Sequence, residues 1–93
     1  MYRIMIIEDN EKIRIELCDF LSKNGYEALG TDDFEHTLDI IHREQPDLLL
    51  LDLNLPVVDG HFICREVRKS SDMPIIIVTS RDSDMDELIS MNL

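Results

Sequence analysis

Residues 46–56 read Pro46-Asp47-Leu48-Leu49-Leu50-Leu51-Asp52-Leu53-Asn54-Leu55-Pro56. Four consecutive leucines fit either a helix or a strand, but two prolines ten positions apart leave too little room for a helix of ordinary length. We therefore predict a strand over residues 48–51 that is buried on both faces, as in parallel sheets covered by helices. Because ligands of open α/β sheets bind beyond the carboxyl ends of the strands, we expect the chemistry at Asp52.

Length and composition indicate one globular domain over residues 1–93, with 44% hydrophobic residues and only three glycines and three prolines. Nine basic residues against twenty acidic ones give a net charge of -11, which repels phosphate backbones and anionic lipids. We expect this segment to bind neither nucleic acid nor membranes directly.

The N-terminal residues lead straight into a short strand rather than a signal peptide, and no apolar run reaches membrane-spanning length. A cytoplasmic location is therefore expected. Cys18 and Cys64 fall inside helical patterns, without the close spacing or histidine neighbours of a metal or redox site, and we interpret both as reduced packing residues.

Short apolar runs alternate with helical patterns along the chain, which predicts four β-α units and a parallel sheet with right-handed crossovers. In the doubly wound order 2-1-3-4, the apolar strand at residues 74–78 lies at the sheet edge, where it is an exposed template for pairing. We therefore expect a fifth strand and helix to be missing from this segment.

The other predicted strands cover residues 3–7 and 26–29. The predicted helices cover residues 11–23 after the N-cap Asn10, a segment from Asp32 or Asp33 to Glu44, a third helix after Asp59-Gly60, and a fourth after Ser83.

Three carboxylates should converge at one edge of this sheet, because Glu8 and Asp9 end the first strand and Asp52 ends the third. Two unit charges about 4 Å apart repel by roughly 4 kcal/mol at an effective dielectric near 20. A hard divalent cation relieves this repulsion, and carboxylates with a carbonyl and waters suit octahedral Mg²⁺. We expect Asp9 and Asp52 as ligands, Glu8 acting directly or through water, and Asn54 offering its main-chain carbonyl.

A carboxylate beside Mg²⁺ that is open to solvent at a strand end can attack a phosphoryl group and form an acyl phosphate. Thr79 follows the neighbouring strand and places a hydroxyl within plausible reach of the phosphoryl oxygens. Its hydrogen bond would exist only in the phosphorylated state.

Over all 93 residues the chain resembles a response-regulator receiver domain of bacterial two-component signalling. Four motifs in order carry the resemblance: the acidic pair Glu8-Asp9, Asp52 in Asp-Leu-Asn-Leu-Pro, Asp59-Gly60, and Thr79-Ser80. The resemblance implies a flavodoxin-like doubly wound parallel sheet, for which receivers are a standard example. It also implies that Asp52 accepts phosphate from a sensor histidine kinase, that Mg²⁺ is required, and that Thr79 is the switch hydroxyl.

Such a domain is a stoichiometric phosphoacceptor that assists its own phosphorylation, and not an enzyme. Receivers continue into a fifth strand with a lysine that pairs with the phosphoryl group, so we expect this receiver to be incomplete at its C-terminus. An acidic receiver often precedes a DNA-binding domain, which suggests transcription regulation. Where receivers often have a polar residue, Phe62 stands here, and we single it out as a contact residue.

Two other functions stay open. A phosphorylation-impaired fragment could oligomerise or swap segments through its fourth strand or fourth helix. An aspartyl-nucleophile phosphohydrolase is suggested by Asp52-Leu53-Asn54, although it needs a second carboxylate where Asn54 stands. A nucleotide-binding module is least favoured, because no Gly-rich loop follows the first strand. Simpler roles also compete: Glu8 and Asp9 could favour a helix N-terminus, and Asp52, Asp59 and Thr79 could be caps.

Overall fold

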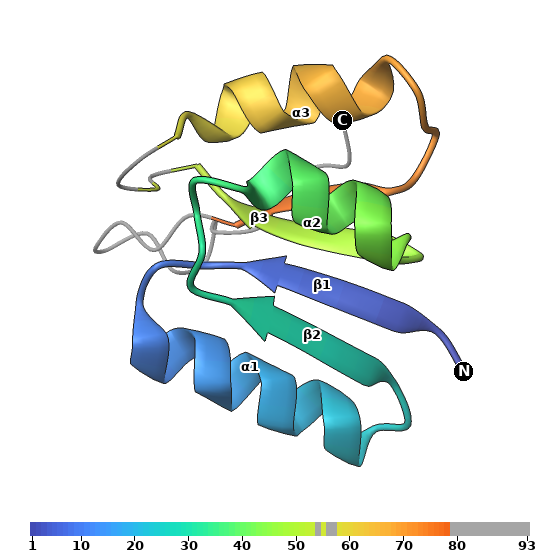
Figure 1. The fold of residues 1–93 in the computed structure, drawn as a ribbon. Helices are drawn as coiled ribbons and strands as arrows, with labels where there is room; N and C mark the ends of the chain where they lie inside the picture. Colours follow the sequence, from blue (N-terminus) through green and yellow to red (C-terminus); the bar gives the residue numbers. More distant parts are fainter. Residues whose placement is uncertain (54, 56–57, 79–93) are drawn as a thin grey trace.

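The apolar runs of the sequence form the strands of one parallel sheet (Figure 1). The structure is a computed structural model and describes residues 1–53, 55 and 58–78. Within this part of the chain the strand order is β2-β1-β3-β4 and every neighbouring pair is parallel, which confirms the predicted order 2-1-3-4. The strands are β1 (Arg3–Ile7), β2 (Glu27–Thr31), β3 (Leu48–Asp52) and β4 (Ile75–Val78).

Helices cover both faces of this sheet: α1 (Glu11–Lys23) lies on one face, and α2 (Thr37–Glu44) and α3 (Gly60–Arg68) lie together on the other (Figure 1). The predicted bounds of the first helix are confirmed. The side chain of Asn10 accepts the N–H of Ile13 at 3.0 Å, and Gly25 follows the C-cap Asn24 with φ of 91°, a conformation that glycine adopts without strain.

The second helix begins later than predicted, at Thr37 rather than directly after Asp32 or Asp33. The carboxylate of Asp33 lies 2.9 Å from Nδ1 of His36 and does not cap the helix, and the hydroxyl of Thr37 donates to the carbonyl of Phe34 at 2.8 Å. These local side-chain contacts compete with helical hydrogen bonds and delay the first turn. The predicted end before Pro46 is confirmed, since Gln45 adopts a left-handed conformation with φ of 50°.

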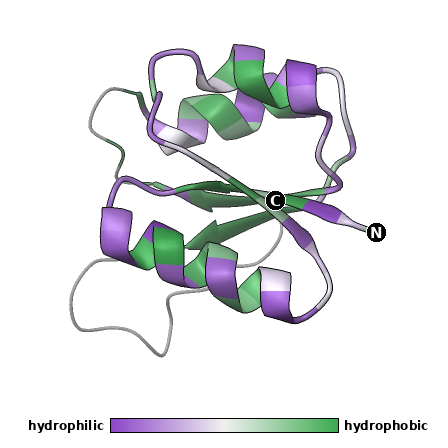
Figure 2. Cartoon of the chain, turned by 60° about the horizontal axis from the view of Figure 1, so that its bottom comes forward, coloured by the Kyte–Doolittle hydropathy of each residue, from purple (hydrophilic) through white to green (hydrophobic). Residues whose placement is uncertain are grey.

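The core lies between the sheet and the α2–α3 layer. Figure 2 shows hydrophobic residues concentrated in the strands of the sheet, whereas hydrophobic and hydrophilic residues alternate along the helices. Alternate residues of β1, β3 and β4 point into this core. On the α1 face, Ile4 and Ile6 are buried, whereas the side chains of β3 and β4 are only half-buried. The prediction that strands β3 and β4 are buried on both faces is therefore wrong for the α1 face, because α1 packs against β1 and β2. The core residues are Met5, Ile7, Ile41, Leu49, Leu51, Ile63, Cys64, Val67, Ile75 and Ile77.

Both cysteines carry free thiols, as predicted. Burial raises the pKa of the Cys18 and Cys64 thiols, which favours the protonated and unreactive form. Within the described residues, the longest helix has 13 residues and none is long and apolar enough to cross a bilayer.

The burial of two isoleucines on different helices yields a matched test of this core. Ile63 in α3 is fully buried, whereas Ile15 in α1 is 57% exposed. Ile63→Ala is expected to lower the free energy of unfolding by about 2–5 kcal/mol, because it removes buried methyl groups and leaves a cavity. Ile15→Ala should change it by less than about 0.5 kcal/mol. Urea unfolding followed by circular dichroism measures both, and equal losses would contradict the packing described.

Candidate functional site

Three carboxylates meet at the carboxyl ends of β1 and β3. The two strands pair in register, with Ile7 opposite Leu51, so the residues that follow them emerge side by side. One carboxylate oxygen from each of Glu8, Asp9 and Asp52 lies within 4.8 Å of the others. The structure therefore brings together the three acidic residues that the sequence singles out.

The cluster is more enclosed than the sequence suggests. Glu8 is 2% exposed and Asp52 is 1% exposed, whereas Asp9 lies on the surface. Asp52 is the last residue of β3 and stays within the strand, opposite Val78 of β4. The expectation of an Asp52 carboxylate open to solvent is therefore wrong for this structure.

Burial raises the pKa of Glu8 from its usual 4.5 to about 7, and the nearby negative charge of Asp52 raises it further. The main-chain N–H of Asn10 opposes this shift by donating to Oε2 of Glu8 at 3.0 Å. At neutral pH the carboxyl group of Glu8 is therefore partly protonated. A cation bound there would favour the ionised form, because an adjacent positive charge stabilises a carboxylate.

The first residue of α3 packs directly against the chain that follows β3. A Cβ on Gly60 would lie 2.8 Å from Cα of Leu53 and 2.9 Å from the carbonyl oxygen of Asp52, which is too close for any side chain. The sequence predicts only a turn at Asp59-Gly60 and misses this role. Asp59 accepts the N–H of His61 at 3.0 Å, which confirms it as the N-cap of α3.

A second residue missed by the sequence reasoning is Arg14, one turn into α1. Its Nη1 donates to the main-chain carbonyl of Glu8 at 2.9 Å. Helical periodicity draws attention to the apolar positions of α1, so a charged residue on this helix is easily overlooked. An arginine or lysine one turn after an acidic pair at a helix N-terminus is the sequence pattern that could have indicated this contact.

The donor set fits a hard divalent cation. Carboxylate oxygens are the ligands that Mg²⁺ and Ca²⁺ prefer, and Mg²⁺ typically takes one or two carboxylates and keeps several waters. Of the predicted site residues, Asn54 and Thr79 lie outside the described part of the chain, so their roles stay predictions.

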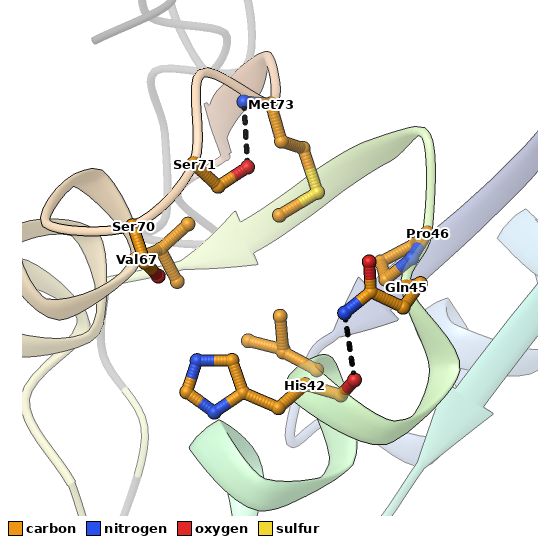
Figure 3. Close-up of a pocket in the computed structure, with 8 residues that line it drawn as sticks. His42, Gln45, Pro46, Val67, Ser70, Ser71 and Met73 are labelled. Carbon is orange, nitrogen blue, oxygen red and sulfur yellow. Dashed lines mark hydrogen bonds between the residues drawn. The ribbon is translucent and has the colours of Figure 1, made fainter.

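A separate hollow of about 120 Å³ opens at the amino ends of β3 and β4, at the opposite edge of the sheet (Figure 3). His42, Gln45, Ser71 and Met73 are among its lining residues, and internal hydrogen bonds join Gln45 to His42 and Ser71 to Met73. None of the three clustered carboxylates lines it. It therefore has no part in the chemistry of the acidic cluster.

Comparison with known proteins gives a consistent result. The family described as "Response regulator receiver domain" matches residues 4–93. The transcriptional regulatory protein YxdJ of Bacillus subtilis is 44% identical over 91 residues, which are 98% of this chain and 40% of that protein. The chain thus spans less than half the length of this relative.

Solved structures agree with the sequence comparison. The BeF3-activated N-terminal receiver domain of Klebsiella pneumoniae RstA is 34% identical, with a TM-score of 0.80 over 91% of this chain and 73% of that one. The response regulator protein TrrA of Thermotoga maritima, in complex with Mg²⁺-BeF, is 31% identical with a TM-score of 0.80, over 94% and 79%. A second structure contains TrrA with the histidine kinase ThkA, at 32% identity and a TM-score of 0.78, over 94% and 78%.

The raised pKa of Glu8 predicts a pH-dependent stability in metal-free buffer. Between pH 4.5 and about 7 the folded chain binds more protons than the unfolded chain at this group. Its stabilising contribution is therefore complete below the usual pKa and is lost as the pH rises through 7, with a slope of at most about 1.4 kcal/mol per pH unit. Urea unfolding in EDTA from about pH 5 to about pH 8 should show a shallower decline for Glu8→Gln than for the unsubstituted chain. Parallel profiles would contradict the assignment.

Proposed function

This chain belongs to the response regulator receiver domain family, and on that premise we propose that Asp52 accepts a phosphoryl group from the histidine of a sensor kinase with the help of Mg²⁺. The observation that carries the proposal is the group of carboxylate oxygens from Glu8, Asp9 and Asp52 within 4.8 Å, at the ends of paired strands. A receiver uses the phosphoryl group as a signal, so the chain acts stoichiometrically and not as a turnover enzyme.

In this proposal Asp9 and Asp52 hold the cation directly, and Glu8 holds it directly or through water. The predicted fourth contact is the main-chain carbonyl of Asn54. When bound, Mg²⁺ supplies positive charge that offsets both the carboxylates and the incoming phosphoryl oxygens. The relative TrrA, solved with Mg²⁺-BeF, supports this choice of cation.

The transfer step is a displacement at phosphorus. A carboxylate oxygen of Asp52 forms the new P–O bond while the P–N bond to the kinase imidazole breaks. The electron pair of that bond returns to the imidazole nitrogen, and the product is an acyl phosphate on Asp52. The strand holds the nucleophile in place, because Leu51 pairs with Ile7 on one side and Asp52 pairs with Val78 on the other.

The relatives support a proposed phosphoryl donor and a proposed output. A sensor histidine kinase is the proposed phosphoryl donor, supported by the structure of TrrA with ThkA. Regulation of transcription is the proposed output, supported by the name of the YxdJ relative, of which this chain covers 40%. The hydroxyl of Thr79 is proposed to bind the phosphoryl group and to switch the surface.

We also propose that the chain self-associates with a second copy through β4. This strand is the last one in the described sheet order, and its residues Ile76 and Val78 are only half-buried on the α1 face. Burial of such an apolar strand against a second copy would remove it from water.

Light scattering over a dilution series should show a mass that rises toward that of a dimer as the protein concentration increases. A constant monomer mass at every concentration would exclude this association.

Phosphorylation itself is tested by intact-mass spectrometry after incubation with Mg²⁺ and a small acyl phosphate donor. The expected result is the addition of one phosphoryl group to the chain, and none to Asp52→Asn or to a sample with excess EDTA. The matched control is Asp47→Asn, because Asp47 precedes the same strand at its opposite end and binds the N–H of Arg3 at 2.8 Å. Equal labelling of Asp52→Asn would show that another residue is the acceptor, and an unlabelled but folded chain would refute the proposed function.

A further inference from the structure

We propose that Arg14 is a positioning residue that fixes the acidic pair of the metal site through the main-chain carbonyl of Glu8. The inference rests on the proposed function of the site and adds a residue to it. The contact that carries it is the hydrogen bond from Nη1 of Arg14 to the Glu8 carbonyl oxygen at 2.9 Å. A guanidinium donor makes this bond charge-assisted and stronger than a neutral one.

The position of this bond lets it orient both acidic side chains. The carbonyl group belongs to the peptide unit that joins Glu8 to Asp9, and a peptide unit is planar. A donor that holds its oxygen therefore restrains both Cα atoms, and both acidic side chains start from these atoms.

The stem of Arg14 is guided by β2. A Cβ on Gly30 would lie 3.1 Å from Cγ and 3.3 Å from Cδ of Arg14. The side chain of Arg14 therefore crosses β2 at Gly30, where the absence of a Cβ leaves room for it. Gly30 pairs with Ile6 of β1, two residues before Glu8. The arginine thus passes over β2 close to the end of β1.

Positioning and simple electrostatics predict opposite effects on metal binding. Loss of a positive charge near the site should tighten Mg²⁺ binding if charge alone matters, because like charges repel. Loss of a restraint on the ligands should weaken it, since partners that orient metal ligands typically contribute about 10–100-fold in affinity. The sign of the change therefore separates the two roles, and a purely structural role would lower stability without changing the affinity of the folded chain.

The test is a Mg²⁺ titration of the chain followed by two-dimensional amide NMR, which reports folding and affinity in the same spectra. Arg14→Met keeps an apolar side chain over Gly30 and removes the hydrogen-bond donor. Arg14→Gln keeps a polar end group on a side chain that is too short to reach the carbonyl of Glu8. Arg65→Gln is the control, because Arg65 is exposed on α3 and loses the same unit charge. We expect the Kd for Mg²⁺ to rise about tenfold in both Arg14 variants and to stay within about twofold in the control.

Unchanged or tighter binding in a folded Arg14 variant, with normal binding by the unsubstituted chain, would overturn the role of Arg14 and leave the proposed function intact. Absence of Mg²⁺ binding by the unsubstituted chain would overturn both. If both Arg14 variants fail to fold, the residue is a structural anchor of α1 and the positioning role is refuted.

Discussion

Repulsion among the carboxylates at the ends of β1 and β3 is the constraint on which the site depends. At about 4 Å, each pair of charges costs roughly 4 kcal/mol at an effective dielectric of 20, against a typical stability of about 5–15 kcal/mol for a whole domain. Burial, and to a smaller extent the charge of Asp52, raises the pKa of Glu8, and a proton on this carboxyl group also lowers the repulsion within the cluster. A divalent cation offers another solution, because its positive charge offsets the negative charges of the carboxylates.

Main-chain geometry brings these charges together at the ends of β1 and β3. The register of β1 with β3 sets the separation of the strand ends, and Asn10 ties α1 to the turn that follows Glu8. Gly60 lets α3 approach the main chain beside Asp52. Each of these contacts fixes the chain near an acidic residue, and the N–H of Asn10 also binds Oε2 of Glu8.

Apolar runs, turn residues and strand ends predicted a parallel sheet, the first helix and the convergence of three acidic residues. The strand order came from the resemblance to receiver domains. The sequence placed the start of the second helix too early, since the pairing of Asp33 with His36 depends on side-chain geometry that periodicity does not describe. It also predicted an accessible Asp52, although this residue is buried. The roles of Arg14 and Gly60 depend on contacts between elements far apart in the chain, which one sequence cannot reveal.

The most direct test of the central claim is to locate the metal. Crystals of the chain soaked in Mn²⁺, a substitute for Mg²⁺ with a measurable anomalous signal, would show whether a cation binds among the three carboxylates. The account predicts a single strong anomalous peak within coordination distance of Asp9 and Asp52, with Glu8 in the first or second shell. A peak elsewhere on the acidic surface, with none between the ends of β1 and β3, would contradict it.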